Sequence, residues 1–348
     1  MLLNIAWFEI RYWLRSWMLW IFTLVIAGLF FGAVSTDHVQ VGGALSNTLR
    51  NAPFVIQNFY AMAGLLTLLM VTAFVNSAAT RDFSHNTYQI VFSTPLRRRD
   101  FLLGRFFGAT IVSIVPMLGV SIGILLAKYM PWVEPERWES ILWSAHLKGI
   151  LVFALPNTFF MAAIIFTIAV LVRNDIFAFV GALLLLVGYG TSQALMTNIE
   201  RENIASLLDP FAIRTFSIAT KYWTVADKNS LALGFTGMLL WNRLLWIAVG
   251  ALFLAFACYR FSFAERRKKS RKLKEEGSVD SAPIAPPEIR GHSNAWQMYW
   301  SSTKIHLSGI LSNIVFIVVL LAGLVNCVPA IIFNAREGYG NSTLPVTY

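Results

Sequence analysis

The sequence predicts an all-α membrane protein, and three observations lead to this fold class. Of the 348 residues, 57% are hydrophobic and only 13% are charged, whereas soluble domains carry about a quarter charged residues. The apolar residues are gathered in uncharged runs, and six of these runs are long enough to cross a hydrocarbon layer of about 30 Å as helices. The runs are continuously apolar and lack the period-two alternation of outer-membrane strands. We therefore expect helices whose backbone bonds are satisfied within each segment.

We predict six spans in the first three quarters of the chain and a seventh near its end. The sixth is the shortest, because its uncharged run Leu244–Tyr259 follows Arg243, whose long side chain could snorkel to an interface or face a polar interior. In chain order, the predicted spans cover about 16–36, 58–80, 106–128, 149–172, 176–197, 240–260 and 306–333.

Residues 1–15 have the pattern of an interfacial amphipathic helix ahead of the first span. Arg11 and Arg15 share one helical face. Apolar residues recur at helical spacing on another face: Ile10, Trp13, Leu14 and Trp17. A simple extension of the first span is the alternative, because apolar residues at positions 2, 3 and 5 blur the polar face.

Residues 263–291 are predicted to form a basic cytoplasmic linker rich in Pro and Ser, which separates the six-span unit from residues 292–348. Its basic run at 266–274 could suggest nucleic-acid binding. Such a run beside a membrane span more often sets topology and contacts lipid headgroups, so no nucleic-acid partner is expected.

The distribution of charge predicts the orientation. If successive loops alternate between sides, 18 of the 28 Lys and Arg residues fall on the side that holds the N-terminus, 81–105, Arg173 and 260–304. The side richer in basic residues is expected to be cytoplasmic. We therefore predict a multi-pass protein of the cell (inner) membrane with its N-terminus in the cytoplasm and its C-terminus outside.

No reacting group stands out in the chain. Cys258 and Cys327 lie on different predicted helices, and the five His residues form no ligand pair, so no metal site is expected. The phosphate-binding pattern Gly-x-x-x-x-Gly-Lys-Ser/Thr is missing from the sequence. We therefore expect no catalytic residues, no cofactor in this chain and no enzymatic activity of its own.

Two connecting segments carry more apolar residues than a solvated loop would. Within 81–105, Val91, Phe92 and Leu96 with Tyr88 could form one side of a short helical segment. Pro95 disfavours helix at Thr94 and so ends the helix, which would act as a docking element or a lid. Residues 197–242 outside the membrane are expected to be helical and interfacial.

Glycines spaced four apart allow close approach of helices inside three spans. The pairs are Gly28 with Gly32, Gly104 with Gly108, and Gly119 with Gly123.

Residues 1 to about 262 resemble the permeases of ABC transporters of the type-2 exporter class. The resemblance is carried by RDFSHNTYQIVFSTPLRRRDFLLGRF (81–106), LLDPFAIRTF (207–216), YWTVADKNS (222–230) and WNRLLW (241–246). It implies a six-helix transmembrane domain over 16–262, an ABC ATPase subunit that holds ATP-Mg, and a second permease half or a homodimer partner within the lipid bilayer. It also implies short external helices between spans five and six, and a coupling helix that contacts the ATPase between spans two and three. By position, the coupling loop would comprise Arg81, Asp82, Tyr88, Gln89, Thr94, Pro95, Arg97, Arg98 and Arg99.

The tail 292–348 is similar to the start of a second permease half in proteins that fuse an exporter permease to a zinc aminopeptidase. The resemblance implies an interfacial helix followed by the seventh span, and it suggests that the chain is a truncated product or the first part of a split or larger permease. The sequence holds no zinc-peptidase pattern, so no peptidase activity is expected.

The predicted function is therefore that of a transmembrane permease subunit of an ATP-driven exporter. The alternatives are a membrane protein outside this class, either an ion-coupled carrier or a membrane enzyme. A carrier would place ionisable groups inside its spans, where each costs about 2.5–3.5 kcal/mol. An enzyme would cluster its acids, whereas Glu200, Glu202 and Asp209 are loosely grouped.

Overall fold

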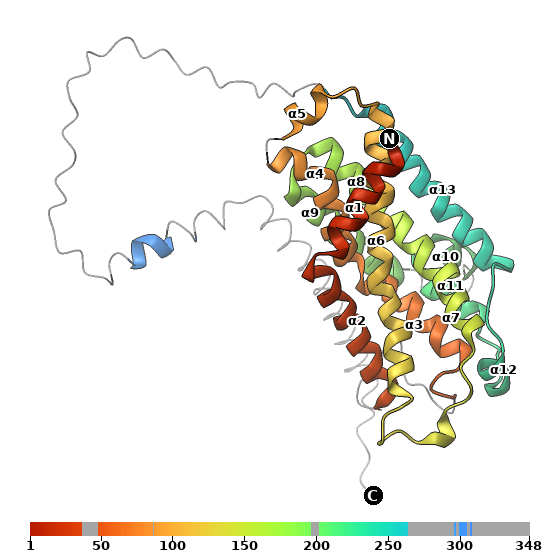
Figure 1. The fold of residues 1–348 in the computed structure, drawn as a ribbon. Coiled ribbons are helices and arrows are strands. Elements are labelled where there is room, and N and C mark those ends of the chain that lie inside the picture. The colour runs from red at the N-terminus through yellow and green to blue at the C-terminus, as the bar shows by residue number, and fades with distance from the viewer. Residues whose placement is uncertain are drawn as a thin grey trace, which may run out of the picture.

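The computed structural model describes residues 1–36, 48–85, 87–195, 202–263, 296, 299–304 and 307. Within these residues every regular element is helical (Figure 1). The predicted linker beyond residue 263 and the predicted seventh span therefore lie almost wholly outside the described residues.

The helices are long and apolar enough to make an integral membrane protein. Four helices among the described residues are long and apolar enough to cross a membrane. A fifth span is present if two helices joined at a bend are taken together as one span. The four are α2 (Trp17–Ser35), α6 (Arg98–Ala127), the continuous helix Trp143–Val172 and α13 (Gly237–Arg260). The bent pair is α3 (Pro53–Leu66) with α4 (Leu68–Ser84). A further apolar helix, α9, runs from Asp175 to Leu195.

The predicted second span, 58–80, is a broken helix in the structure. Helices α3 and α4 meet at an angle of 51°. The break is at Thr67, whose hydroxyl donates to the carbonyl of Ala63 at 2.7 Å. Thr72 makes the same bond within the unbroken α4, so this bond lies at the break without explaining it.

The helices that contain the predicted third and fourth spans begin earlier than the uncharged runs of those spans. Helix α6 starts at Arg98 rather than near 106, and its 30 residues are about 45 Å long. The fourth consists of α7 (Trp143–Gly149), a π-helical turn (Ile150–Ala154) and α8 (Leu155–Val172). A charged residue ends the part of a helix that lipid can surround, but the helix itself continues into the interface.

Helix α6 lies at the centre of the packing, against both α1 (Leu2–Leu14) and α2 (Figure 1). A Cβ on Gly108 would lie 2.8 Å from the Ala6 carbonyl oxygen, and one on Gly119 would lie 2.7 Å from that of Thr23. These glycines therefore let the backbones touch, as the sequence spacing predicts. Gly28 differs, because nothing lies within 4 Å of its Cβ position.

Helix α1 packs along the first turns of α6, which adds a protein contact to the interfacial helix expected at 1–15. Its buried residues are Ala6, Glu9 and Trp13. The sequence pattern places Trp13 on the buried side correctly, but Leu14 and Trp17 are exposed. Burial of Glu9, a carboxylate, requires compensating charges.

Three short helices follow α9, within the segment expected to be helical. They are α10 (Glu202–Leu208), α11 (Ile213–Ala219) and α12 (Val225–Ser230). Helix α12 lies at the opposite end of the molecule from α5 (Tyr88–Ser93) (Figure 1).

Candidate functional site

The loop between α4 and α6 forms a short helix at one end of the bundle. Helix α5 covers Tyr88–Ser93. Thr94 follows it in an extended conformation, with φ −78° and ψ 153°. A residue before proline is pushed into this region, so Pro95 accounts for the helix end.

The outer side of α5 is exposed. Ile90, an apolar residue, is 70% exposed. Gln89 beside it is also exposed, and so are Thr94 and Pro95. This surface contains three of the nine residues predicted for the coupling loop, namely Gln89, Thr94 and Pro95. Ile90 gives it an apolar centre.

The inner side of α5 belongs to a cluster of six rings, here called the aromatic cluster. Its members are Phe83, Tyr88, Phe92, Phe101, Phe261 and Phe263. The ring of Phe92 lies 4.5 Å from that of Phe263 and 5.9 Å from that of Phe101. Because these rings come from the ends of α4, α6 and α13, a displacement of α5 acts on three long helices at once.

Arg97, Arg98 and Arg99 lie where α6 begins, and all three are exposed. The Arg98 guanidinium donates to the carbonyl of Phe261 at 3.5 Å. Among the described residues no carboxylate forms an ion pair with any of the three. Three unpaired cations beside an apolar helix suit an acidic partner surface or lipid phosphates.

Arg81 and Asp82 lie behind the loop instead of on its exposed surface. Together with Glu9 and Arg105 they form an ion cluster that contains two arginines and two carboxylates. Arg81 contacts Glu9 at 2.5 Å, Arg105 contacts Glu9 at 2.6 Å, and Arg105 also contacts Asp82 at 2.5 Å. The cluster is neutral as a whole, which is what permits its burial.

The ion cluster joins α1, α4 and α6 at the end of the bundle that carries α5. Sequence reasoning missed Glu9 and Arg105 as members of it. The available signal was Glu9 itself, a lone acid three residues after Ala6 and four before Trp13, and therefore on the buried face of α1.

A second polar cluster lies around α10 and α11. Arg243 is only 1% exposed, and its guanidinium donates to the side-chain oxygen of Asn157 at 2.7 Å. Asp209 accepts backbone N–H groups from Phe211 at 3.0 Å and from Arg214 at 2.6 Å. Burial raises the pKa of Asp209, and these hydrogen bonds together with Arg243 oppose that shift. Arg243 therefore faces a polar interior and does not snorkel to an interface, which was the other alternative.

Neither cluster has the composition of a metal centre. In the described part of the chain, no group of three or more His, Cys, Asp or Glu residues could hold a metal ion. Each carboxylate of the ion cluster is already paired with an arginine. These ion pairs link helices to one another and can transmit force between them.

The sequence matches a family model described as "ABC-2 family transporter protein" over residues 3–266. Apart from Leu2, the first residue of α1, this range contains the described helices from α1 to α13. A search among curated protein sequences finds no match.

Proposed function

Because the chain belongs to the ABC-2 family of transporter proteins, we propose that it is the membrane subunit of an exporter driven by an ABC ATPase on a separate polypeptide. ATP-Mg is bound by that partner, and this chain converts the partner's movement into a rearrangement of its helices. The permease pairs with a second permease half or with a second copy of itself in the cell membrane.

The geometry of α5 carries the proposal. Its outer side exposes Gln89 and Ile90, whereas its inner side contacts the ends of three long helices through Phe92. A docking element must be open to a partner on one side and rigidly connected on the other. Helix α5 meets both requirements without any reacting side chain.

The basic residues support an orientation with α5 in the cytoplasm, where an ATPase would find it. Arg97, Arg98 and Arg99 lie beside α5, and Arg81 and Arg105 lie behind it. A concentration of arginines at one end is typical of the cytoplasmic side.

The test is the effect of Ile90→Asp on the complex with the ATPase. The tagged chain is purified from its own cells in mild detergent, and the bound ATPase subunit is quantified by mass spectrometry and Mg-ATP hydrolysis. We expect Ile90→Asp to reduce the bound ATPase at least about tenfold, because a charge replaces the apolar centre of the contact.

The matched control is Val225→Asp on α12. Val225 is 48% exposed and lies on the element at the other end of the molecule. It should leave the bound ATPase unchanged. Equal amounts of ATPase with wild type and Ile90→Asp would contradict the coupling role, and transport that persists without any ATPase would favour an ion-coupled carrier.

A further inference from the structure

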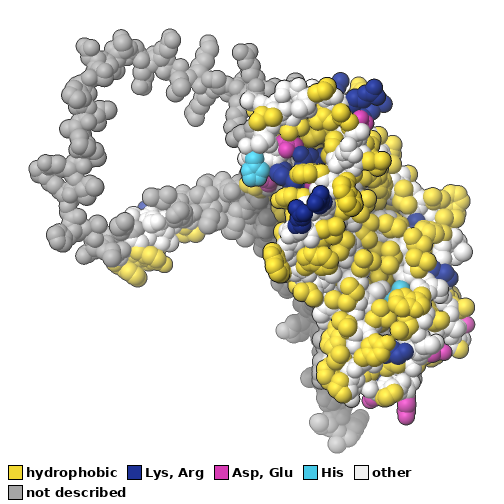
Figure 2. All heavy atoms as spheres, in the orientation of Figure 1, with side chains coloured by type: hydrophobic (Ala, Val, Ile, Leu, Met, Phe, Trp, Pro, Cys, Tyr) yellow, Lys and Arg dark blue, Asp and Glu magenta, His cyan; other side chains and the backbone are white. Residues whose placement is uncertain are grey.

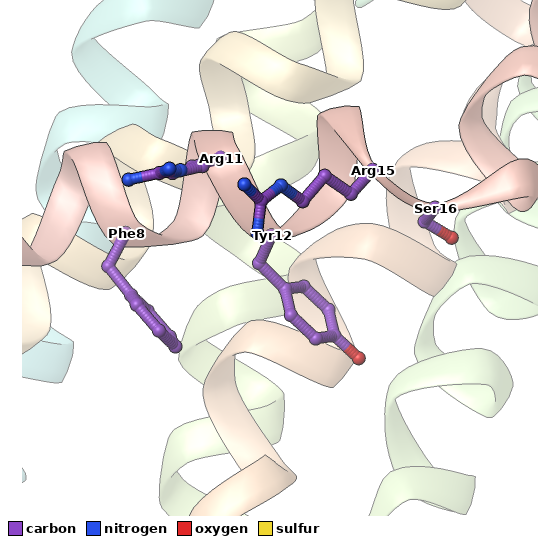
Figure 3. Close-up of a pocket in the computed structure, with 5 residues that line it drawn as sticks. All are labelled: Phe8, Arg11, Tyr12, Arg15 and Ser16. Atoms are coloured by element: carbon purple, nitrogen blue, oxygen red, sulfur yellow. The ribbon is translucent and has the colours of Figure 1, made fainter.

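The exposed side of α1 holds an arginine-lined hollow that the coupling role does not use. The hollow has a volume of about 440 Å³, and here it is called the arginine pocket. It is lined by Phe8, Arg11, Tyr12, Arg15 and Ser16 (Figure 3). We infer that the arginine pocket binds the phosphate headgroup of an anionic phospholipid from the surrounding membrane.

The two arginine side chains lie along the same stretch of α1 and line the same hollow. Figure 3 shows the Arg15 side chain running back along α1 toward Arg11, with the ring of Tyr12 projecting from the same stretch of helix. Basic side chains also gather over α1 in the space-filling view, among hydrophobic ones (Figure 2). Two guanidinium groups one helical turn apart can both donate to one phosphate group.

The charge of the pocket is available to a ligand. Arg11 and Arg15 are exposed, and among the described residues neither forms an ion pair. The acid nearest to them along α1, Glu9, is fully buried and already paired with Arg81 and Arg105. The described residues therefore leave the positive charge of the pocket unneutralised, and an anion from outside can bind there.

The position of the pocket in the membrane selects a lipid as that anion. Helix α2 has 19 residues and is about 28 Å long, which matches the hydrocarbon thickness. Helix α2 begins directly after Ser16, so Arg15 and Ser16 lie at one edge of the hydrocarbon layer, where phospholipid phosphates are found. Trp17 is 83% exposed there, as expected for an interfacial aromatic residue.

The pocket also adjoins the ion cluster. The Arg81 guanidinium lies 4.1 Å from the centre of the Tyr12 ring, and Arg81 itself binds Glu9. A headgroup in the pocket would thus sit one side chain away from the end of α4, from which the chain continues into α5. Lipid composition would in this way influence the position of α5, the element proposed to contact the ATPase.

The test measures lipid retained by the purified chain, and so does not depend on ATPase binding. The chain is mixed in detergent with equal amounts of phosphatidylglycerol and phosphatidylcholine, and bound lipid is counted by native mass spectrometry. We expect a preference for phosphatidylglycerol that falls at least about tenfold in the double variant Arg11→Ala/Arg15→Ala. Should that variant unfold, Arg11→Gln/Arg15→Gln keeps the side-chain length and must show the same loss.

The matched control removes two other exposed basic residues, in the variant Arg260→Ala/Lys304→Ala. It should keep the preference for phosphatidylglycerol, because neither residue lines the pocket. An equal loss in the control would show that net charge alone attracts the lipid, and it would overturn the proposal. Undiminished retention by both Arg11/Arg15 variants would do the same.

A third arm separates a lipid from free phosphate. Inorganic phosphate at millimolar concentration should leave the bound phosphatidylglycerol in place, because it lacks the acyl chains that the surrounding apolar side chains contact. Displacement of the lipid by inorganic phosphate would show a site for the free anion and would contradict the assignment to a membrane lipid.

Discussion

Glu9 shows how one residue can hold three helices together. Its carboxylate is fully buried and receives both Arg81 from α4 and Arg105 from α6. The contact with Arg81 joins residues 72 positions apart in the chain. A charge in such a place is tolerated only while its partners remain, because an uncompensated buried charge is strongly unfavourable.

We predict that Glu9→Gln destabilises the protein by about 3–5 kcal/mol, because two arginines are then left with the single carboxylate of Asp82. Thermal unfolding of the detergent-purified protein measures the effect. Glu136→Gln is the control, since Glu136 is exposed, and it should shift the free energy of unfolding by less than about 0.5 kcal/mol. A Glu9→Gln protein as stable as the control would show that the ion cluster contributes nothing.

At the scale of the elements, the contact of α2 with α6 depends on glycines of α6. A Cβ on Gly119 would lie 2.7 Å from the Thr23 carbonyl oxygen and 3.0 Å from the Ala27 nitrogen. Both atoms belong to the backbone of α2, so they cannot turn away as a side chain could. The two helices would have to separate to admit even one methyl group.

Gly119→Ala is therefore expected to cost about 1–3 kcal/mol of stability. Gly28→Ala is the natural comparison, because nothing lies within 4 Å of its Cβ position and alanine favours a helix by about 0.5–1 kcal/mol. The two variants should shift the unfolding temperature in opposite directions. Shifts of the same sign and size would contradict the role of Gly119 in the helix contact.

The sequence predicts the helical membrane architecture well, because lipid excludes charge and so determines where helices cross. It predicts helix ends less well, since charge marks the edge of the lipid, whereas α6 continues to Arg98 and is held there by protein contacts. The bend at Thr67 could not be predicted, because Thr72 and Thr167 also lie in apolar runs and make the same hydroxyl bond inside unbroken helices.

The candidate site could likewise be predicted from the sequence only in part. The exposed tip with Gln89 and Ile90 follows from local spacing and from Pro95, which ends the helix. The ion cluster and the contact of Phe263 with Phe92 join distant parts of the chain, and no local pattern contains them. Phe263 was expected to begin the linker, yet its ring packs at 4.5 Å against that of Phe92.

At the scale of the whole molecule, the uneven distribution of basic residues predicts which end faces the cytoplasm. In a background with Cys258 and Cys327 replaced by alanine, we expect Ser230→Cys to react with a membrane-impermeant maleimide in right-side-out vesicles. Ser93→Cys should react only after the vesicles are opened. Both positions are exposed and they lie on α12 and α5, at opposite ends (Figure 1). The reverse labelling pattern would invert the orientation and remove the ATPase from the side of α5.

The 51° bend between α3 and α4 at Thr67 is a place where α4 can tilt without bending an intact helix. The 17 residues of α4 give an arm of about 25 Å, so a tilt of about 10° would carry its far end through about 4 Å. The residues before the bend need not follow this tilt, since the helix is already interrupted there. One end of the molecule could therefore open while the other stays shut, which any pump must achieve to avoid becoming a leak.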